Sequence, residues 1–498
     1  MVATPGDAIA PLAEEESGST VFVVCAQPGT ADERAALDRA VADGARRGVR
    51  VPEDPWVLDA EVGKITALVL DALRELRPLR VRTLDPDPAH VAFDAEAKRP
   101  VIAEPSLRGS VARATITAAR RYQRERGTPL FVDCRRAGAD PRLGAQACVR
   151  HPRPTRWLVR GTDGRLSAYL PSAGGVLRWT ERTAGRDDWS GPDLLEGPDL
   201  LPGLSVVQDA DGYVHLIGLR RAKRADGKEH VDVVHATQYQ SGRPLGPWHS
   251  AGNPNANDRA KAREVGFPTA VFDAGGNLHV FARNFGHGVS TRRQTPDGKW
   301  GAWQHLRGAA VADELVAVPG RLGGAEVWAR TRDAASAVRW HQEAPQGAWT
   351  LDAEPVVSPY PGSLSAAPEA GAVRFRYAAT NEVCVGVPGG GPVGLQGADG
   401  AGPIAGVAGV DIQGWGCTVL ARWGHAGACA VGAHEDGRPE GGVWWFDVGE
   451  TSLAPPAVAV DGRGRAVIAL LGADGRLRVA RQESGVNGLA FGVWLTVG

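Results

Sequence analysis

The stretch Gly275-Gly276-Asn277-Leu278-His279-Val280 decides the fold, because a tight turn followed by an alternating strand recurs through residues 153–498. The successive turn glycines are separated by 48, 64, 48, 47, 45 and 48 residues. A fixed period of this length indicates a repeat architecture, and four short strands per unit of ~40–50 residues are typical of a propeller blade. The equivalent turn glycines are Gly164, Gly212, Gly276, Gly324, Gly371, Gly416 and Gly464.

A tryptophan near the end of most units has the same period. The chain contains 15 Trp but only 10 Phe and 6 Tyr, and one large aromatic residue per unit, packed between neighbouring units, explains this excess. We therefore predict a seven-bladed β-propeller over residues 153–498, with six or eight blades as alternatives because the fifth and sixth units are degenerate. The unit-closing tryptophans are Trp189, Trp248, Trp303, Trp349, Trp445 and Trp494, and the strands expected in the last unit are 456–460, 465–470, 477–481 and 493–497.

Residues 20–150 have a different pattern, in which short apolar runs alternate with segments of helical periodicity. The order of these elements predicts a small parallel α/β domain with right-handed crossovers. Residues 1–19 are predicted to be a flexible N-terminus. The expected strands are 21–26, 79–84 and 130–132, and the expected helices are 31–47, 65–76 and 111–124.

The composition excludes several classes of protein. A formal net charge of −1 with 23% charged residues provides no basic surface for nucleic acid, and no run approaches the ~18 apolar residues of a membrane-spanning helix. Residues 1–20 lack the basic and apolar segments of a secretion signal, so we expect a cytoplasmic protein, or a secreted one whose leader has been removed. Six cysteines are too few for a disulfide scaffold, and buried thiols are the favoured interpretation.

Within the N-terminal domain, residues 73–90 (Leu-Arg-Glu-Leu-Arg-Pro-Leu-Arg-Val-Arg-Thr-Leu-Asp-Pro-Asp-Pro-Ala-His) resemble the PIG-L/LmbE-like N-deacetylase family. The helix from Ser110 to Tyr122 and the strand 129–132 continue the resemblance. It implies a zinc enzyme in which a His-Pro-Asp-Asp motif after the first strand supplies two metal ligands and the base. A later His, at the start of a helix, is the third ligand that the resemblance implies.

The sequence departs from that family where its chemistry is carried. The stretch that matches the motif is Ala26-Gln27-Pro28-Gly29-Thr30, and the stretch expected to hold the later His, 105–110, contains none. Catalytic zinc needs three ligands from His, Asp, Glu or Cys, and without the metal a water molecule keeps its high pKa. We therefore expect no zinc, no other cofactor and no catalytic residue here. The domain is then a pseudodeacetylase that serves as a scaffold or partner-binding module.

In the propeller, the segments from Asn277 to Arg283 and from Lys299 to Trp303 resemble blades of the PLL-type lectins. That resemblance implies sugar binding at sites between blades. A pyranose offers its apolar C–H face to an aromatic ring and its hydroxyl groups to Arg, amide or carboxylate groups. We therefore place the candidate ligand site in the third unit, with interblade core as the alternative role for each Trp. Its residues are Arg283, Asn284, Trp300 and Trp303.

His215 and His279 take equivalent positions in the second and third units. We add them to the candidate ligand-binding residues, on one face of the propeller or in its central channel. Ordinary repeat residues with satisfied hydrogen bonds are the alternative.

These observations predict a non-catalytic, lectin-like carbohydrate-binding protein whose ligand is a glycan or a glycosylated small molecule. Several sites on one rigid disc raise the avidity for a multivalent glycan. A protein partner, or a second copy of the chain, is expected at the N-terminal domain. Three alternatives stay open: a zinc-dependent N-deacetylase targeted by the propeller, an enzyme of specialised metabolism with its site in the propeller channel or interdomain cleft, and a displaced site at Asp85, Asp87 and His90, although Asp-Pro-Asp-Pro also suits a turn.

Overall fold

The computed structural model describes residues 1–13, 15, 18–54, 56–59, 61–97, 99–102, 106–137, 145–152, 154–223, 229–332, 335–352, 357–424, 427–485 and 487–497. The chain forms two compact units. The first comprises residues 1–151 and 171–175, and the second comprises residues 152–170 and 176–498.

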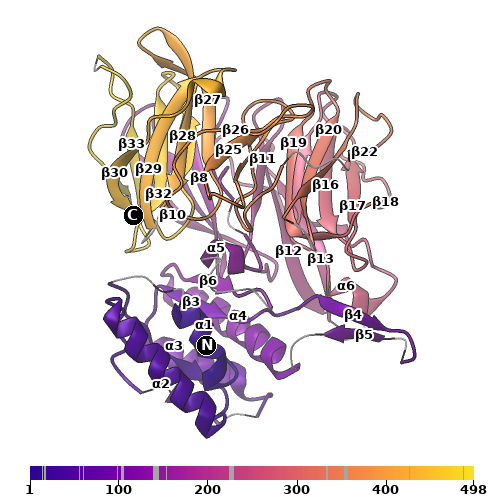
Figure 1. Ribbon diagram of the computed structural model, residues 1–498, viewed down its shortest axis with the longest axis vertical. Helices are drawn as coiled ribbons and strands as arrows, with labels where there is room; N and C mark the ends of the chain where they lie inside the picture. Colours follow the sequence, from indigo (N-terminus) through magenta and orange to yellow (C-terminus); the bar gives the residue numbers. More distant parts are fainter. Residues whose placement is uncertain are drawn as a thin grey trace. The chain divides into compact units, whose positions relative to one another are not determined.

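Within the described residues the second unit is a seven-bladed β-propeller, which confirms the prediction from the repeat (Figure 1). Each blade is a four-stranded sheet whose strands follow one another in chain order. The first and second strands are β7 (Leu158–Arg160) and β8 (Leu166–Ser172), β11 (Ser205–Gln208) and β12 (Val214–Lys223), β15 (Thr269–Phe272) and β16 (Leu278–Arg283), β19 (Val311–Pro319) and β20 (Ala325–Thr331), β23 (Ser365–Ala366) and β24 (Val373–Arg376), β27 (Ala405–Ile412) and β28 (Trp415–Trp423), and β31 (Ala457–Val460) and β32 (Ala466–Leu471).

The third and fourth strands form the outer half of each blade and pack outside the buried second strand. Second strands such as β16 and β32 are buried along their whole length, because both faces of a blade pack against its neighbours. The third and fourth strands are β9 (Gly175–Glu181) and β10 (Trp189–Glu196), β13 (Glu229–Thr237) and β14 (His249–Gly252), β17 (Val289–Gln294) and β18 (Gln304–Leu306), β21 (Ala337–His341) and β22 (Thr350–Asp352), β25 (Val383–Gly386) and β26 (Val393–Gly394), β29 (Ala428–Glu435) and β30 (Phe446–Thr451), and β33 (Leu477–Arg481) and β34 (Leu495–Val497).

The recurring glycine is explained by the turn between the first two strands, which needs a residue with positive φ. The φ angle of Gly276 is 73°. In the fourth and sixth blades the predicted glycines, Gly324 and Gly416, are wrong: the positive angles belong to Gly323 (89°) and Gly414 (85°). Both segments contain a second glycine within two residues, so the spacing alone did not identify the correct one.

The connections between strands one and two and between strands three and four form one face of the propeller, which we call the turn face. Neighbouring turns contact one another on it: the Ala274 amide donates to Gly323 O (2.9 Å), and the Gly371 amide donates to Pro319 O (2.7 Å). The connections are residues 161–165, 182–188, 209–213, 238–248, 273–277, 295–303, 320–324, 342–349, 367–372, 387–392, 413–414, 436–445, 461–465 and 482–494.

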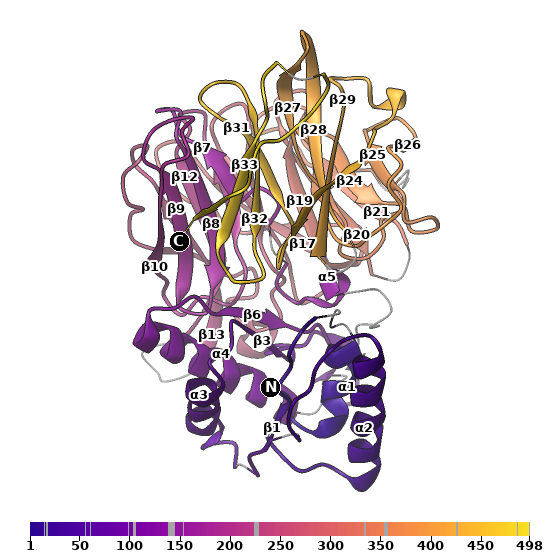
Figure 2. The ribbon, with the colours of Figure 1, turned by 90° about the vertical axis from the view of Figure 1, so that its left-hand side faces the viewer.

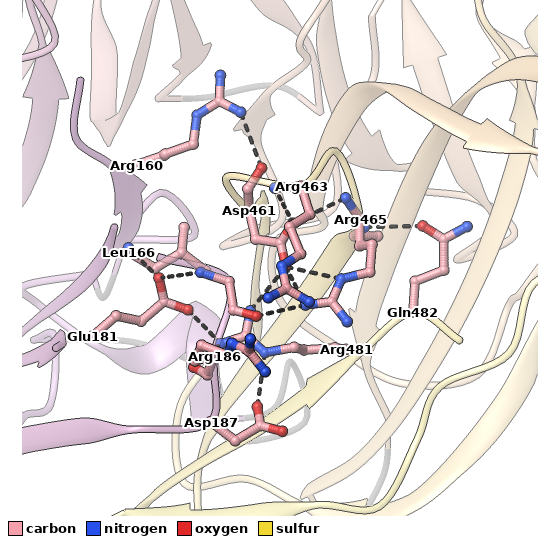
Figure 3. A network of polar contacts seen from close by, with 12 residues as sticks. Arg160, Leu166, Glu181, Arg186, Asp187, Asp461, Arg463, Arg465, Arg481 and Gln482 are labelled. Atoms are coloured by element: carbon pink, nitrogen blue, oxygen red, sulfur yellow. Dashed lines mark hydrogen bonds and ion pairs between the residues drawn. The ribbon is translucent and has the colours of Figure 1, made fainter. Parts of the chain in front are cut away.

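The ring is closed between the seventh and first blades, where β31 lies beside β7 (Figure 2). The guanidinium of Arg481 on β33 is the centre of this closure (Figure 3). It forms ion pairs with Glu181 and with Asp187 (2.8 Å) of the first blade and with Asp461 (3.0 Å) of the seventh. Trp157 adds a hydrogen bond from its indole nitrogen to Pro455 O (3.0 Å).

A cavity of about 530 Å³ runs along the axis of the propeller. It is lined by residues in or next to the first strand of all seven blades, which places it on the propeller axis. The lining residues are Arg156, Leu158, Val159, Arg160, Val206, Val207, Gln208, Ala270, Val271, Phe272, Pro319, Pro368, Gly406, Val407, Ala408, Val458, Ala459 and Val460.

The N-terminal unit contains the expected helices and parallel strands. In Figure 1 its helices α2, α3 and α4 are labelled, and α3 packs against α4. Strand β1 pairs in parallel with β2, and β3 pairs in parallel with β6; the antiparallel hairpin of β4 and β5 was not predicted. The elements are α1 (Pro5–Ala13), β1 (Val24–Cys25), α2 (Ala31–Arg46), β2 (Trp56–Val57), α3 (Ile65–Leu76), β3 (Arg80–Thr83), β4 (His90–Asp94), β5 (Arg99–Ile102), α4 (Ser106–Arg126), β6 (Phe131–Cys134) and α5 (Ala145–Cys148).

Residues 1–19, expected to be a flexible N-terminus, contain α1, and Val2 forms a parallel bridge with Cys25. All six cysteines are buried and carry free thiols. None of the described helices is long and apolar enough to cross a membrane. A short helix, α6 (Arg259–Ala262), lies in the connection between the second and third blades.

Candidate ligand-binding site

His215 lies on β12 at the junction of the second and third blades, where its ring is enclosed by protein. Its Nε2 is 3.2 Å from Asp209 Oδ2, and its Nδ1 is 2.9 Å from His235 Nε2. The two imidazoles stack with their centroids 5.1 Å apart, and Phe272 of the third blade packs edge-on against His215. Burial lowers the pKa of His215 and lowers the pKa of His235 to about 3, so both rings are neutral at pH 7.

His279 repeats this arrangement at the next junction. Its Nε2 is 3.0 Å from Asp273 Oδ2, and its ring packs edge-on against Trp349 of the fourth blade, with centroids 5.9 Å apart. Neither His215 nor His279 lines the axial cavity. Among the residues that the structure describes, no group of three His, Cys, Asp or Glu side chains is placed to hold a metal ion.

The four residues proposed from the third blade are not brought together in one pocket. Strands β16 and β17 pair Arg283 with Val289 and Leu278 with Gln294, and Gln294 in turn pairs with Trp300. Arg283 and Trp300 therefore lie at opposite ends of the blade, roughly 17 Å apart at ~3.3 Å per strand residue.

Arg283 and Asn284 are occupied by contacts within the protein. The buried guanidinium of Arg283 is ion-paired with Asp313 and donates to Glu264 O (2.6 Å). The amide nitrogen of Asn284 lies 2.9 Å from both Ser290 Oγ and His305 Nδ1. These contacts order the connection between β16 and β17, at the end of the blade away from the turn face.

Trp303 connects the third blade to the second. Its indole nitrogen donates to Ala251 O on β14 (3.1 Å). Trp445 and Trp494 repeat the same bond, to Leu395 O (2.8 Å) and Val448 O (3.2 Å) of their preceding blades. In these three units the closing tryptophan therefore fastens its blade to the preceding one, which is the core role that the sequence left open for it.

The large hydrophobic side chains that are exposed in the described part of the propeller lie on its turn face. Among the described residues of this unit, the large hydrophobic side chains classed as exposed belong to turn-face connections or to the first residue after one. These residues are Tyr239 (66% exposed), Leu322 (72%), Trp415 (63%), Trp444 (85%) and Val493 (96%). We call the three aromatic members, Tyr239 of the second blade and Trp415 and Trp444 of the sixth, the aromatic cluster of the turn face, a name that refers to the face they share and not to contact between them.

Trp415 is presented by a rigid hairpin of the sixth blade. The two-residue turn between β27 and β28 consists of Gln413 (φ 56°) and Gly414 (φ 85°), and Ile412 pairs directly with Trp415. Two consecutive positive φ angles match the twist of the flanking strands and hold such a hairpin firmly. The Gln413 amide nitrogen donates to Asn487 Oδ1 of the seventh blade (3.1 Å), so two side-chain amides lie next to the hairpin tip.

The exposure of Trp444 is explained by the position of its neighbour, Trp445. Trp445 is bound to the fifth blade through Leu395 O and lies under the guanidinium of Arg422, 5.2 Å from its ring centroid. Trp444, the residue before it, is left in solvent. The sixth blade thus exposes two indoles on the turn face.

Sequence reasoning did not select Trp415, Trp444 or Tyr239. A usable signal was present: Trp415 stands in the turn segment, where no other unit has Trp, and Trp444 is an additional Trp beside the unit-closing one. A residue that departs from the repeat is not needed for the repeated packing. Whether such a residue is exposed depends on the three-dimensional packing around it, which only the structure shows.

In the N-terminal unit, one residue at a motif position and two residues of the displaced candidate site can be placed. Thr30 is the N-cap of α2: its hydroxyl accepts from the Glu33 amide (3.2 Å), and the Glu33 carboxylate accepts from the Thr30 amide (2.8 Å). Asp85 is buried, accepts a bond from the Asp87 amide (2.9 Å) and lies 3.3 Å from Arg150 Nε. His90 is also buried.

No family model and no curated protein matches the chain. Solved structures that resemble it include the Aleuria aurantia lectin in complex with alpha-methyl-L-fucoside, with 15% identity over 60% of this chain and 97% of that one and a TM-score of 0.36. An ulvan lyase has 12% identity over 69% and 95% and a TM-score of 0.40, and the Penicillium chrysogenum alpha-L-arabinanase complexed with arabinobiose has 12% identity over 57% and 92% and a TM-score of 0.37. Likenesses this weak do not assign a function to this chain.

Proposed function

We propose that this protein is a non-catalytic, lectin-like carbohydrate-binding protein and that the aromatic cluster of its turn face contacts the sugar. The observation that carries the proposal is one-sided exposure: Tyr239, Trp415 and Trp444 are all more than half exposed, and all belong to the same face. Exposing an aromatic ring to water forgoes the free energy of burial, roughly 25 cal/mol per Å² of apolar surface, so aromatic side chains exposed on the same face of the propeller suit a binding surface.

The chemistry beside Trp415 suits a pyranose. The flat indole takes the apolar C–H face of the ring, and the amides of Gln413 and Asn487 are positioned for its hydroxyl groups. Each such contact is weak alone. Because the blades form one rigid disc, several contacts act together on a branched or repeating glycan, and the effective affinity rises by avidity.

For the N-terminal unit we propose the role of a degenerate PIG-L-like scaffold or partner-binding module. Thr30 supports this role, because at a position where the resemblance implies a carboxylate it caps a helix. The β4–β5 hairpin exposes Val91, Phe93, Val101 and Ile102, which suits contact with a protein partner or a second copy of the chain. Zinc analysis of the purified protein tests this part: we expect no metal, and stoichiometric zinc would restore N-deacetylation as the leading function.

A glycan array with the full-length protein tests the proposed function. We expect wild type to be retained on a subset of glycans, and Trp415→Ala and Trp444→Ala to lose at least tenfold in apparent affinity, which corresponds to about 1.4 kcal/mol. Leu322→Ala is the matched control, because Leu322 is an exposed, non-aromatic residue of the same face. Binding that survives both tryptophan substitutions, or no binding to a broad array, contradicts the proposal.

A further inference from the structure

The axial cavity is separate from the aromatic cluster and has the dimensions of a ligand site. At about 530 Å³ it falls within the range of ~300–1,000 Å³ found for small-molecule pockets. Most of its wall is apolar and comes from the first strands of the blades. Its walls are strands of seven sheets, so the cavity is preformed.

The charged side chains that line this cavity are all positive among the described residues. Among its described lining residues there are two arginines, Arg156 and Arg160, and no carboxylate. Arg160 donates to Asp461 O (3.1 Å) at the ring closure. Arg156 crosses the axis from the first blade and donates through Nη2 to Ala367 O of the fifth blade (2.9 Å).

Arg156 is available to a ligand. Its side chain is accessible to water within the axial cavity, and desolvation by the surrounding protein lowers its pKa. Within the described residues, the bond to Ala367 O is the one hydrogen bond of its guanidinium, which has five N–H donors. A cation in such surroundings attracts an anion more strongly than the same cation on an open surface, because the effective dielectric constant is lower.

A second guanidinium lies behind the cavity wall. Arg374 is fully buried, and none of its three side-chain nitrogens has a hydrogen-bond partner in the described structure. Its closest carboxylate oxygen is Glu369 Oε2, at 3.7 Å from Nη2, which is an ion pair of poor geometry. Its Nη1 reaches Gly406 of the cavity lining so closely that a Cβ there would be 2.1 Å away.

An unsatisfied buried guanidinium destabilises a protein, so Arg374 calls for an explanation. Burial lowers the pKa of Arg374 to about 10; the carboxylate of Glu369 raises it, and the positive charge of Arg156 lowers it. The two guanidiniums are thus close enough to repel each other, with Glu369 as the neighbouring carboxylate. An oxyanion bound in the cavity compensates the positive charge of both guanidiniums and accepts hydrogen bonds from the remaining N–H donors of Arg156, whereas its effect on Arg374 is through charge alone.

We propose that the axial cavity binds a small molecule through an oxyanion group, with Arg156 as the direct ligand and Arg374 as the second cation behind Gly406. Carboxylate, sulfate and phosphate share the required chemistry: negative charge and several acceptor oxygens arranged for a guanidinium fork. The volume admits a ligand of about monosaccharide size. This site is independent of the turn face, so it stands whether or not the turn face binds glycans.

Isothermal titration calorimetry of the full-length protein tests the proposal. The probes are sodium glucuronate, sulfate and phosphate, each at constant ionic strength in chloride, with glucose as the neutral counterpart of glucuronate. We expect saturable binding of at least one oxyanion and none of glucose. The probe that binds most tightly distinguishes a carboxylated from a sulfated or phosphorylated ligand. Absence of binding by all three oxyanions overturns the proposal.

Variants separate the site from general salt effects. Arg156→Met and Arg374→Met are each expected to weaken oxyanion binding at least tenfold, whereas Arg182→Met, an exposed arginine of the first blade, leaves it unchanged. Trp415→Ala also leaves it unchanged, which distinguishes failure of this proposal from failure of glycan binding at the turn face. Equal binding by wild type and Arg156→Met overturns the proposal, and this variant suffices if Arg374→Met fails to fold. Sulfate and phosphate stabilise many proteins without a site, so a rise in melting temperature shared by all variants counts against it.

Discussion

The third and sixth blades use tryptophan in opposite ways. In the third blade Trp303 is bonded to Ala251 O, and Trp300 packs edge-on against His235, so both indoles serve the junction with the second blade. In the sixth blade Trp445 has the same fastening role toward the fifth blade, while Trp415 and Trp444 face solvent.

The difference teaches how to separate structural from functional residues in a repeat. A position that recurs in every unit satisfies a requirement that every unit has, which in a propeller is packing against the next blade. A large aromatic residue outside the recurring positions either packs elsewhere in the core, as Trp179 and Trp340 do, or is exposed. The two exposed tryptophans of the sixth blade belong to this second group, and they carry the proposed glycan contact.

The neighbouring pair Trp444 and Trp445 gives the sharpest test of this comparison. Trp445→Ala removes a bond to Leu395 O and the packing on Arg422, and we expect it to lower the free energy of unfolding by about 2–4 kcal/mol. Trp444→Ala removes a side chain that is 85% exposed, and we expect a change within about 0.5 kcal/mol. Urea denaturation followed by far-ultraviolet circular dichroism measures both.

Similar losses of unfolding free energy in the two variants would contradict the opposite roles assigned to Trp444 and Trp445. Glycan retention provides the reverse readout: Trp445→Ala at a temperature where it remains folded is expected to bind as wild type does, and Trp444→Ala is not. A stable Trp445→Ala variant that has lost glycan binding contradicts the division of roles.

Acid is expected to destabilise the junctions of the second and third blades, because they contain buried histidines. Burial lowers the pKa of His235 to about 3, with further lowering by His215 and His249, whereas an unfolded His titrates near 6.5. The unfolded state therefore binds more protons below pH 6.5, and the stability from this neutral ring is complete above pH 6.5 and is lost as the pH falls toward 3. We expect about 2 kcal/mol of loss between pH 6.5 and 4.5 from His235.

His235→Gln isolates this contribution, since glutamine does not titrate yet still offers hydrogen-bonding groups to Thr237 and His215. We expect a flatter dependence of unfolding free energy on pH in this variant, measured by urea denaturation at pH 7.5, 6.0 and 4.5. An exposed histidine of the third blade, His305, is the control: His305→Gln is expected to follow the wild-type curve closely. Parallel curves for wild type and His235→Gln show that the buried ring does not govern acid sensitivity.

The blade architecture is predictable from the sequence because every blade imposes the same local requirements on its residues. A turn that needs positive φ selects glycine, and a strand buried on both faces selects an apolar run, so both features recur in the sequence with the period of the blade. Errors arose where a second glycine lay within two residues, so that Gly324 and Gly416 were chosen in place of Gly323 and Gly414, and where elements were short, as in β2 and the β4–β5 hairpin. Two- to five-residue strands leave too little periodicity to detect.

The site was less predictable because it depends on pairing and exposure. Strand pairing separates Arg283 from Trp300, and counting along the hairpin that follows Arg283 would have shown this separation from the sequence. The bond of Asp209 to His215 and that of Asp273 to His279 have the same spacing and were detectable as a repeat. That Arg374 has no hydrogen bond within the described residues, and that Trp415 is exposed, follow from the packing of several blades and from no local pattern.

The smallest effect concerns a single hydrogen bond of the repeated fastener. Trp303→Phe keeps an aromatic ring but removes the indole N–H, which leaves the carbonyl oxygen of the buried residue Ala251 without this donor (3.1 Å in the native protein). We expect a loss of about 1 kcal/mol in unfolding free energy, the usual cost of one such bond, with glycan retention unchanged. Trp415→Phe is the matched control, in which stability is unchanged because no bond of that indole nitrogen holds a neighbouring blade. If Trp303→Phe leaves stability unchanged and weakens glycan binding instead, then Trp303 belongs to a ligand site, and the third blade joins the sixth in carrying function.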